Sequence, residues 1–194
     1  MPLEPDSPDP DPLSSEQWTT DGGSRLDILI DRHSWPQSEV VAARPALCRA
    51  TDIACETFGW PPLEVGAMFC GDDRIRDLNM RFRGKDSPTN VLSFPSGDDV
   101  MEDDIARDGA ITGTGLLTPG EIAIAYETLC REATNEAKSF GDHLVHLWVH
   151  GLLHLMGHDH EAEAEAELME DGEIRVLARL GIANPYAVQA GGSG

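Results

Sequence analysis

The sequence has no long apolar run, because no stretch reaches the roughly eighteen apolar residues that a membrane-spanning helix needs. It is also poor in cysteine: the four cysteines are scattered, and no two of them form a C-x-x-C pair. Such cysteines favour reduced core residues over a disulfide framework or a second zinc site. The first residues lack the basic start and apolar stretch of a secretory signal, so we expect a cytoplasmic protein without a membrane anchor.

Basic residues are few, with 14 Lys and Arg against 35 Asp and Glu and a formal net charge of −21. Counterion release from nucleic acid requires clustered basic side chains, so this balance argues against non-specific binding of DNA or RNA. One strip of twelve residues is an exception to this acidic composition, because it contains five basic residues: Arg74, Arg76, Arg81, Arg83 and Lys85. This strip either holds phosphates or forms an ordinary solvated helix face.

The length suits one compact domain with tails. Residues 1–24 are acidic and rich in proline, which predicts a disordered tail. Residues 25–186 are expected to form the domain, and residues 187–194 a flexible C-terminal tail. Within the domain, the acidic and glycine-bearing residues 95–119 predict a loop or insertion.

Hydrophobic periodicity predicts four strands and five helices. The predicted strands are Arg25–Asp31, Leu63–Cys70, Asn90–Phe94 and Gly120–Ala125. The predicted helices are Ser38–Phe58, with Pro45 bending it or delaying its start, then Gly71–Phe82, Tyr126–Ala137, Phe140–Met156 and Glu161–Leu180. This order predicts an α+β (mixed α/β) fold, a small mixed four-stranded sheet packed with about five helices in a single domain.

The segment HGLLHLMGHDH places His150, His154 and His160 at a spacing suited to one metal ion. On the predicted helix, residues four apart lie on the same face, so His150 and His154 point the same way. Gly157 supplies the glycine that commonly ends a helix with positive φ, which lets the chain bring His160 back towards the first two rings. Three imidazoles bind zinc at about 2.0–2.1 Å and leave a fourth position for water, which is the ligand count of a catalytic site.

Other interpretations of these histidines exist, because two histidines on an apolar helix are also compatible with hydrogen-bonded core residues. The third histidine favours the metal site. Asp159 either orients a ligand or caps the next helix. His143 and His146 lie on nearly the same helical face and are expected to support or pack against the ligands, whereas His158 and His33 are expected to be ordinary polar residues.

A glutamate is missing beside the first predicted ligand, because Gly151 stands where the zinc-protease signature H-E-x-x-H places its general base. Without that glutamate, peptide hydrolysis loses its usual proton acceptor. A metal ion still lowers the pKa of bound water to about 7 and polarises a phosphoryl oxygen. The motif therefore favours a phosphodiester substrate, with a metalloprotease-like hydrolase as the alternative.

Four segments resemble the YbeY-type family of single-strand-specific metallo-endoribonucleases, which act in ribosomal RNA maturation and ribosome quality control. HGLLHLMGHDH resembles the metal motif of that family, and MRFRGKDSPTNVLSFP its other signature segment. PGEIAIA resembles the following strand, and EAELMEDGEIRVLARLGIANPY the C-terminal helix and ending. The resemblance covers about residues 25–186, and an acidic insertion around residues 98–108 departs from it.

The resemblance implies that His150, His154 and His160 bind one Zn²⁺ ion and that Arg83 completes the catalytic site by contacting the RNA backbone. A guanidinium can hold a phosphate bidentately and neutralise charge that develops during cleavage, although a plain surface arginine is the alternative. The implied partners are single-stranded RNA, as in a ribosomal RNA precursor, and the ribosome or its small-subunit proteins. Neither DNA nor a membrane is expected. A non-catalytic ribosome-assembly factor with a structural zinc is a second alternative.

Overall fold

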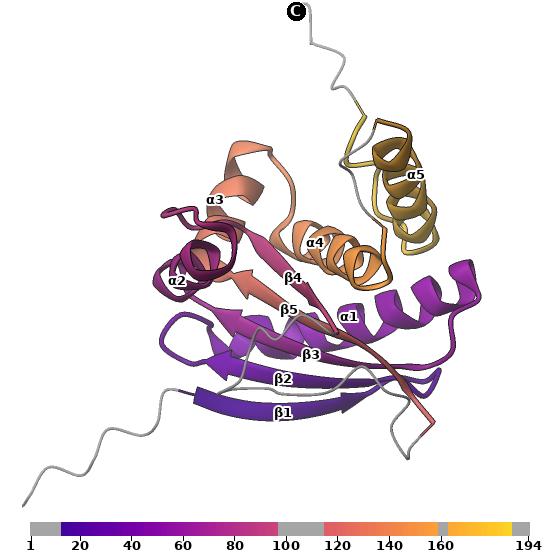
Figure 1. Cartoon of the computed structure of the whole chain (residues 1–194), viewed down its shortest axis with the longest axis horizontal. Coiled ribbons are helices and arrows are strands. Elements are labelled where there is room, and N and C mark those ends of the chain that lie inside the picture. Colours follow the sequence, from indigo (N-terminus) through magenta and orange to yellow (C-terminus); the bar gives the residue numbers. More distant parts are fainter. Residues whose placement is uncertain (1–12, 97–114, 159–162, 188–194) are drawn as a thin grey trace, which may run out of the picture.

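The computed structural model describes residues 13–96, 115–158 and 163–187, which form one mixed sheet covered by helices (Figure 1). The strands are β1 (Leu13–Thr19), β2 (Arg25–Asp31), β3 (Leu63–Cys70), β4 (Val91–Pro95) and β5 (Leu117–Ala125). The helices are α1 (Gln37–Phe58), α2 (Asp72–Arg83), α3 (Tyr126–Asn135), α4 (Phe140–Leu155) and α5 (Glu163–Arg179). The predicted α+β class is confirmed.

The sheet has the order β1-β2-β3-β5-β4 (Figure 1). Its three central strands, β2, β3 and β5, run parallel, while β1 and β4 pair antiparallel at the two edges. The parallel connection from β2 to β3 passes through α1, as a parallel pair requires a crossover.

The prediction of four strands is wrong by one, because the segment predicted as a disordered tail contains β1. Residues Leu13–Thr19 pair with β2 in a continuous register from Leu13↔Asp31 to Thr19↔Arg25. Trp18 is fully buried against the core. The tail predicted over residues 1–24 therefore ends earlier than expected, and the domain includes residues from Leu13 onwards. Residues 1–12 lie outside the described part of the chain, as do the insertion around 98–108 and residues 188–194.

The other predicted elements match the structure to within a few residues. Strand β5 begins at Leu117 rather than Gly120, so the predicted loop is shorter than expected at that end. Helix α1 begins at Gln37 and continues through Pro45, so the proline does not delay its start. None of the helices in the described residues is both long and apolar enough to cross a membrane.

The sheet separates two apolar clusters, one on each face. The larger cluster joins α1, α4 and α5 to one face of the sheet, and the smaller one joins α2 to the opposite face. Strand β5 shows the alternation directly, because Ile122 and Ile124 belong to the larger cluster while Ala123 and Ala125 belong to the smaller one. Helix α4 therefore lies between the sheet and α5, where its side chains are largely excluded from water.

Candidate metal centre

Helix α4 carries a line of histidines along an otherwise apolar helix. It starts at Ser139, whose hydroxyl oxygen accepts a hydrogen bond from the Asp142 amide at 3.0 Å, as a helix N-cap does. Its histidines are spaced three, four and four residues apart, which keeps them on one face of the helix. They are His143, His146, His150 and His154. The predicted end of the helix is also observed, because α4 ends at Leu155 and Gly157 follows with φ 84°.

The rings of His150 and His154 face each other at the carboxyl end of α4. Their Nε2 atoms lie 3.1 Å apart, and the ring planes are inclined at 80°. Two nitrogens bound to one zinc ion at tetrahedral angles would lie about 3.3–3.4 Å apart, given zinc–nitrogen bonds of about 2.0–2.1 Å. The observed separation therefore fits two ligands of a single metal ion.

Glu173 of α5 is the buried group that holds the His150 ring of this pair. Its Oε1 atom accepts a hydrogen bond from His150 Nδ1 at 2.8 Å, and its Oε2 atom accepts one from His146 Nε2 at 2.8 Å and another from the Tyr186 hydroxyl. Burial raises the pKa of the Glu173 carboxyl group, but the hydrogen bonds from His146, His150 and Tyr186 outweigh burial and lower that pKa to about 2. Because His150 donates from Nδ1, its Nε2 atom, which faces His154 Nε2, is the one that would bind a metal ion.

The third predicted ligand, His160, lies outside the described residues, and so does Asp159. Within residues 13–96, 115–158 and 163–187 there is accordingly no cluster of three His, Cys, Asp or Glu side chains that would hold a metal ion. The described part of the chain supplies two imidazoles and the carboxylate behind them. The role of His160 stays a prediction.

Arg83 comes from a different layer of the fold than these histidines. It is the last residue of α2, its side chain is exposed, and it makes no hydrogen bond or ion pair with any described residue. Helix α2 packs on the face of the sheet opposite to α4. The loop after Arg83 is fixed by the buried Asn79, whose side-chain amide donates a hydrogen bond to the Ser87 carbonyl at 2.7 Å. The loop leads into β4 beside the metal centre.

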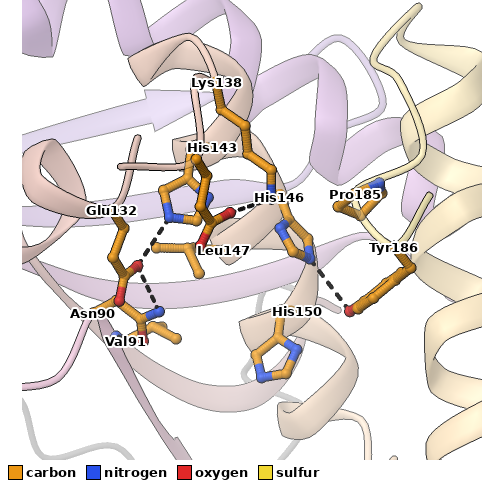
Figure 2. Close-up of a pocket in the computed structure, with 11 residues that line it drawn as sticks. Asn90, Val91, Glu132, Lys138, His143, His146, Leu147, His150, Pro185 and Tyr186 are labelled. Atoms are coloured by element: carbon orange, nitrogen blue, oxygen red, sulfur yellow. Dashed lines mark hydrogen bonds and ion pairs between the residues drawn. The ribbon is translucent and has the colours of Figure 1, made fainter. Parts of the chain in front are cut away.

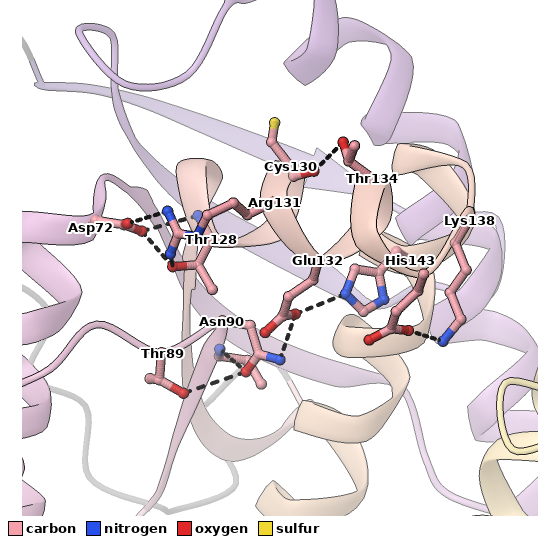
Figure 3. A network of polar contacts seen from close by, with 12 residues as sticks. Asp72, Thr89, Asn90, Thr128, Cys130, Arg131, Glu132, Thr134, Lys138 and His143 are labelled. Atoms are coloured by element: carbon pink, nitrogen blue, oxygen red, sulfur yellow. Dashed lines mark hydrogen bonds and ion pairs between the residues drawn. The ribbon is translucent and has the colours of Figure 1, made fainter.

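The two histidines at the start of the line are held by carboxylates rather than facing the ligand pair. His143 donates from Nε2 to Glu132 Oε2 at 2.9 Å, and Asn90 Nδ2 donates to the same oxygen at 2.9 Å (Figure 3). His146 is bound to Glu173, as described above. The Nδ1 atoms of His143 and His146 are buried and have no partner among the described residues, which suits rings that carry their proton on Nε2.

A cavity of about 370 Å³ adjoins His150. Its walls come from the start of β4, the end of α3, helix α4 and the chain after α5 (Figure 2). The lining residues are Asn90, Val91, Glu132, Glu136, Lys138, His143, His146, Leu147, His150, Pro185 and Tyr186. Neither Arg83 nor His154 belongs to this lining, and His33 and His158 do not belong to it either.

Gly151 lies where α4 presses closest against the sheet. A Cβ atom at this position would come within 2.9 Å of Ile122 Cδ1 and 3.2 Å of Ile122 Cγ2. A larger side chain after His150 would therefore require the Ile122 side chain to shift. The glycine at this position, where the zinc-protease signature has its general base, is thus compatible with close packing of α4 on β5.

Comparison with known proteins decides the family. Residues 38–181 match the family model described as Endoribonuclease YbeY. The chain belongs to the YbeY family. A relative named Endoribonuclease YbeY from Rhodopseudomonas palustris is 46% identical and aligns over 84% of this chain and 81% of its own length. Relatives of the same name from Chelativorans sp. and Jannaschia sp. are 45% and 42% identical, covering 84% and 83% of this chain and 93% and 99% of their own lengths.

A solution structure of a Thermotoga maritima protein superposes with a TM-score of 0.48 at 22% identity, covering 87% of this chain and 99% of that chain. The resemblance to the YbeY family that the sequence motifs suggested is thus confirmed by the family model and the curated relatives.

Sequence reasoning missed the supporting carboxylates of this YbeY-family site. Glu173 lies in an acidic helix, where charged residues are usually solvated. Its spacing could have indicated that it is buried. Glu173 stands four residues after Met169 and three before Val176, and the structure buries both of these apolar residues with it. Glu132 and Tyr186 come from other segments and offered no comparable signal.

Proposed function

We propose that this YbeY-family protein is a zinc-dependent endoribonuclease that cuts single-stranded RNA during ribosomal RNA maturation. The observation that carries the proposal is the pair of Nε2 atoms of His150 and His154, 3.1 Å apart, with the buried Glu173 fixed behind His150. The relatives that match most of the chain carry the name Endoribonuclease YbeY. The protein acts in the cytoplasm, with the ribosome or its small-subunit proteins as partners.

Each residue has a distinct role in this proposal. His150, His154 and His160 hold the zinc ion, which when bound supplies Lewis-acid polarisation of a phosphoryl oxygen. Glu173 keeps the His150 ring in the orientation and tautomer that binding requires. Arg83 holds a phosphate of the RNA backbone with its exposed guanidinium group, which has no competing partner among the described residues.

The surroundings of the metal centre favour a single strand. The cavity beside His150 is about 370 Å³, which suits one splayed nucleotide rather than a stacked and paired duplex. An accessible cavity also favours a catalytic centre over a structural zinc, which normally closes its fourth position with a protein ligand. Gly151, which stands where the zinc-protease signature has its glutamate, disfavours a metalloprotease.

A cleavage assay tests this function. An end-labelled unpaired oligoribonucleotide, the same strand in a duplex and a denatured protein are each incubated with zinc or with excess chelator. We expect cleavage of the single strand alone, and only with zinc. Products ending in a 2′,3′-cyclic phosphate would identify the substrate 2′-hydroxyl as nucleophile, whereas 5′-phosphate and 3′-hydroxyl ends would identify water.

The same assay tests Arg83. Replacing Arg83→Ala removes a charge-assisted phosphate contact and should lower the cleavage rate by about 10–100-fold, because hydrogen bonds to charged groups contribute about 1.5–3 kcal/mol. Arg81→Ala is the matched control, because Arg81 is an equally exposed arginine on the same helix turn and lies over the Phe82 ring. Equal rates for the two variants would remove Arg83 from the site.

A further inference from the structure

The cavity beside His150 combines ring faces, apolar groups and a short polar edge. Tyr186 and Pro185 form one side, while Asn90 and Glu132 form the opposite side, with the histidines of α4 between them (Figure 2). Eight of its eleven lining residues are polar or charged, and the apolar ones are Val91, Leu147 and Pro185. The cavity thus has the character of a binding pocket rather than a packing defect.

The ring side of the cavity is held in place. The Tyr186 hydroxyl donates a hydrogen bond to the buried Glu173, and its ring meets the His146 ring edge to face at 5.7 Å. The Tyr186 residue is nevertheless 38% exposed, so part of its surface is available to a ligand. Tyrosine and histidine rings are the usual surfaces on which proteins stack unpaired nucleobases.

The polar edge consists of one carboxylate whose orientation is fixed. Glu132 Oε2 accepts hydrogen bonds from His143 and Asn90, and Asn90 is itself anchored because its Oδ1 atom accepts a hydrogen bond from the Val91 amide at 2.7 Å (Figure 3). The second oxygen of Glu132, Oε1, has no partner among the described residues. It is therefore a preorganised acceptor at the wall of the cavity.

The charge of the lining disfavours a phosphate inside the cavity. Apart from the histidines, Lys138 is the basic residue of the lining. Its Nζ atom lies 2.5 Å from Glu136 Oε2, so the two side chains form an ion pair. The carboxylate of Glu132 is then left without a cation, so an anion would be repelled. A neutral group that donates a hydrogen bond is favoured instead.

From this geometry we infer that the cavity binds one unpaired nucleobase carrying an exocyclic amino group, which donates a hydrogen bond to Glu132 Oε1. The inference rests on the proposed endoribonuclease function, because it places the phosphate of that nucleotide at the His150–His154 pair. Cytosine presents an amino donor where uracil presents a carbonyl acceptor, and carboxylate side chains accept from the cytosine N4 amino group. Glu132 is thus the residue that determines base specificity.

Binding of two short RNAs tests this inference. Fluorescein-labelled hexacytidylate and hexauridylate are titrated with the full chain in excess chelator, where cleavage is suppressed, and anisotropy gives both dissociation constants. We expect hexacytidylate to bind about tenfold more tightly, the usual discrimination of one base-edge contact. Equal binding of the two RNAs, or no binding of either, would overturn the pocket.

The Glu132→Gln variant gives a sharper outcome. The side-chain carbonyl would keep the hydrogen bonds from His143 and Asn90, so the amide NH₂ group would face the cavity and donate to the uracil O4 atom. The preference should therefore fall to less than about twofold or invert towards hexauridylate. Glu136→Gln removes the same charge from the same lining and should change both affinities by one common factor. An unaltered preference in Glu132→Gln would contradict the inference.

Zinc-loaded cleavage of the same two RNAs separates this inference from the proposed function. Cleavage of both RNAs at equal rates would overturn the base pocket and leave the endoribonuclease intact. Absence of cleavage together with a retained binding preference would overturn the proposed function and leave the pocket.

Discussion

At the scale of the residue, the proposed metal centre depends on a carboxylate that water does not reach. Glu173 is fully buried, yet it stays ionised because three hydrogen-bond donors surround it. Burying a charge costs free energy unless the charge is paired, so the presence of a buried carboxylate at this position needs an explanation. We explain the buried carboxylate by its effect on the orientation of His150, whose Nδ1 atom lies 2.8 Å from Glu173 Oε1.

The Glu173→Gln variant measures that contribution. The amide keeps the shape of the side chain but weakens the hydrogen bond to His150, so zinc affinity should fall by about 10–100-fold, as is typical when the partner of a ligating histidine is lost. Competition with a chromophoric chelator gives the affinity directly. Glu170→Gln, an exposed change on the same helix, should leave the affinity unaltered. A variant at Glu173 that binds zinc like the unchanged protein would refute the positioning role.

Cys70 provides a prediction about pH. Cys70 is the last residue of β3 and belongs to the smaller apolar cluster, and burial raises the pKa of its thiol to about 12. A thiol with a raised pKa stays protonated, and therefore unreactive, until the pH approaches that value. At pH 8.5 iodoacetamide should label Cys70 at least tenfold more slowly in the native protein than in the urea-unfolded one, where its pKa returns to about 8.5. Mass spectrometry of tryptic peptides gives both rates, and equal rates would contradict the burial.

How far the sequence predicts the site depends on where the residues lie along the chain. His150 and His154 could be predicted because a helix repeats every 3.6 residues, so their spacing alone places them side by side. Glu173 could not, because its contact with His150 arises from the packing of α5 on α4, which no local pattern encodes. The same holds for Glu132 and Asn90, which approach each other from different segments.

At the scale of the element, α4 is fixed to the sheet by a glycine. Gly151→Ala would place a methyl group 2.9 Å from Ile122 Cδ1, with Cγ2 and Cγ1 also closer than ordinary contact. Overpacking of this kind should lower the free energy of unfolding by about 1–3 kcal/mol. Urea denaturation measures the change.

The control for that variant lies on the same helix. Gly141 is exposed, and a methyl group added there would have no atom within 4 Å. Gly141→Ala should therefore raise the free energy of unfolding by about 0.5–1 kcal/mol through helix propensity. If Gly151→Ala stabilised the protein as Gly141→Ala is expected to do, the space between α4 and β5 would be large enough for a side chain at position 151. The close packing inferred at Gly151 would then be contradicted.

Strand β1 shows why one element escaped prediction. Its sequence, LSSEQWT, offers a single large apolar residue to the core, Trp18, and leaves most other positions partly or fully exposed. An edge strand needs only one paired side, so its hydrophobic alternation can be this weak. Strand β2 was predictable because Leu26, Ile28 and Ile30 all face the core.

At the scale of the whole molecule, the sheet brings distant segments together at one end. Asn90 lies directly before the edge strand β4, helix α4 carries the histidines, and Tyr186 lies in the chain after α5. The class of fold followed from the order of strands and helices, but the strand order β1-β2-β3-β5-β4 did not, because pairing is decided by long-range contacts. The net charge of −21 also limits where RNA can bind, because a strongly acidic surface repels the RNA backbone outside the site.

The central claim is that one metal ion between His150 and His154 carries RNA cleavage, and a stoichiometric titration tests it most directly. Metal-stripped protein receives zinc in fractions of an equivalent while the initial cleavage rate of an unpaired oligoribonucleotide is recorded. We expect the rate to rise linearly and to stop rising at one equivalent of zinc per chain, and the His154→Ala variant to show no such rise. A rate that is already maximal without zinc, or that stays at zero through several equivalents, would contradict the claim.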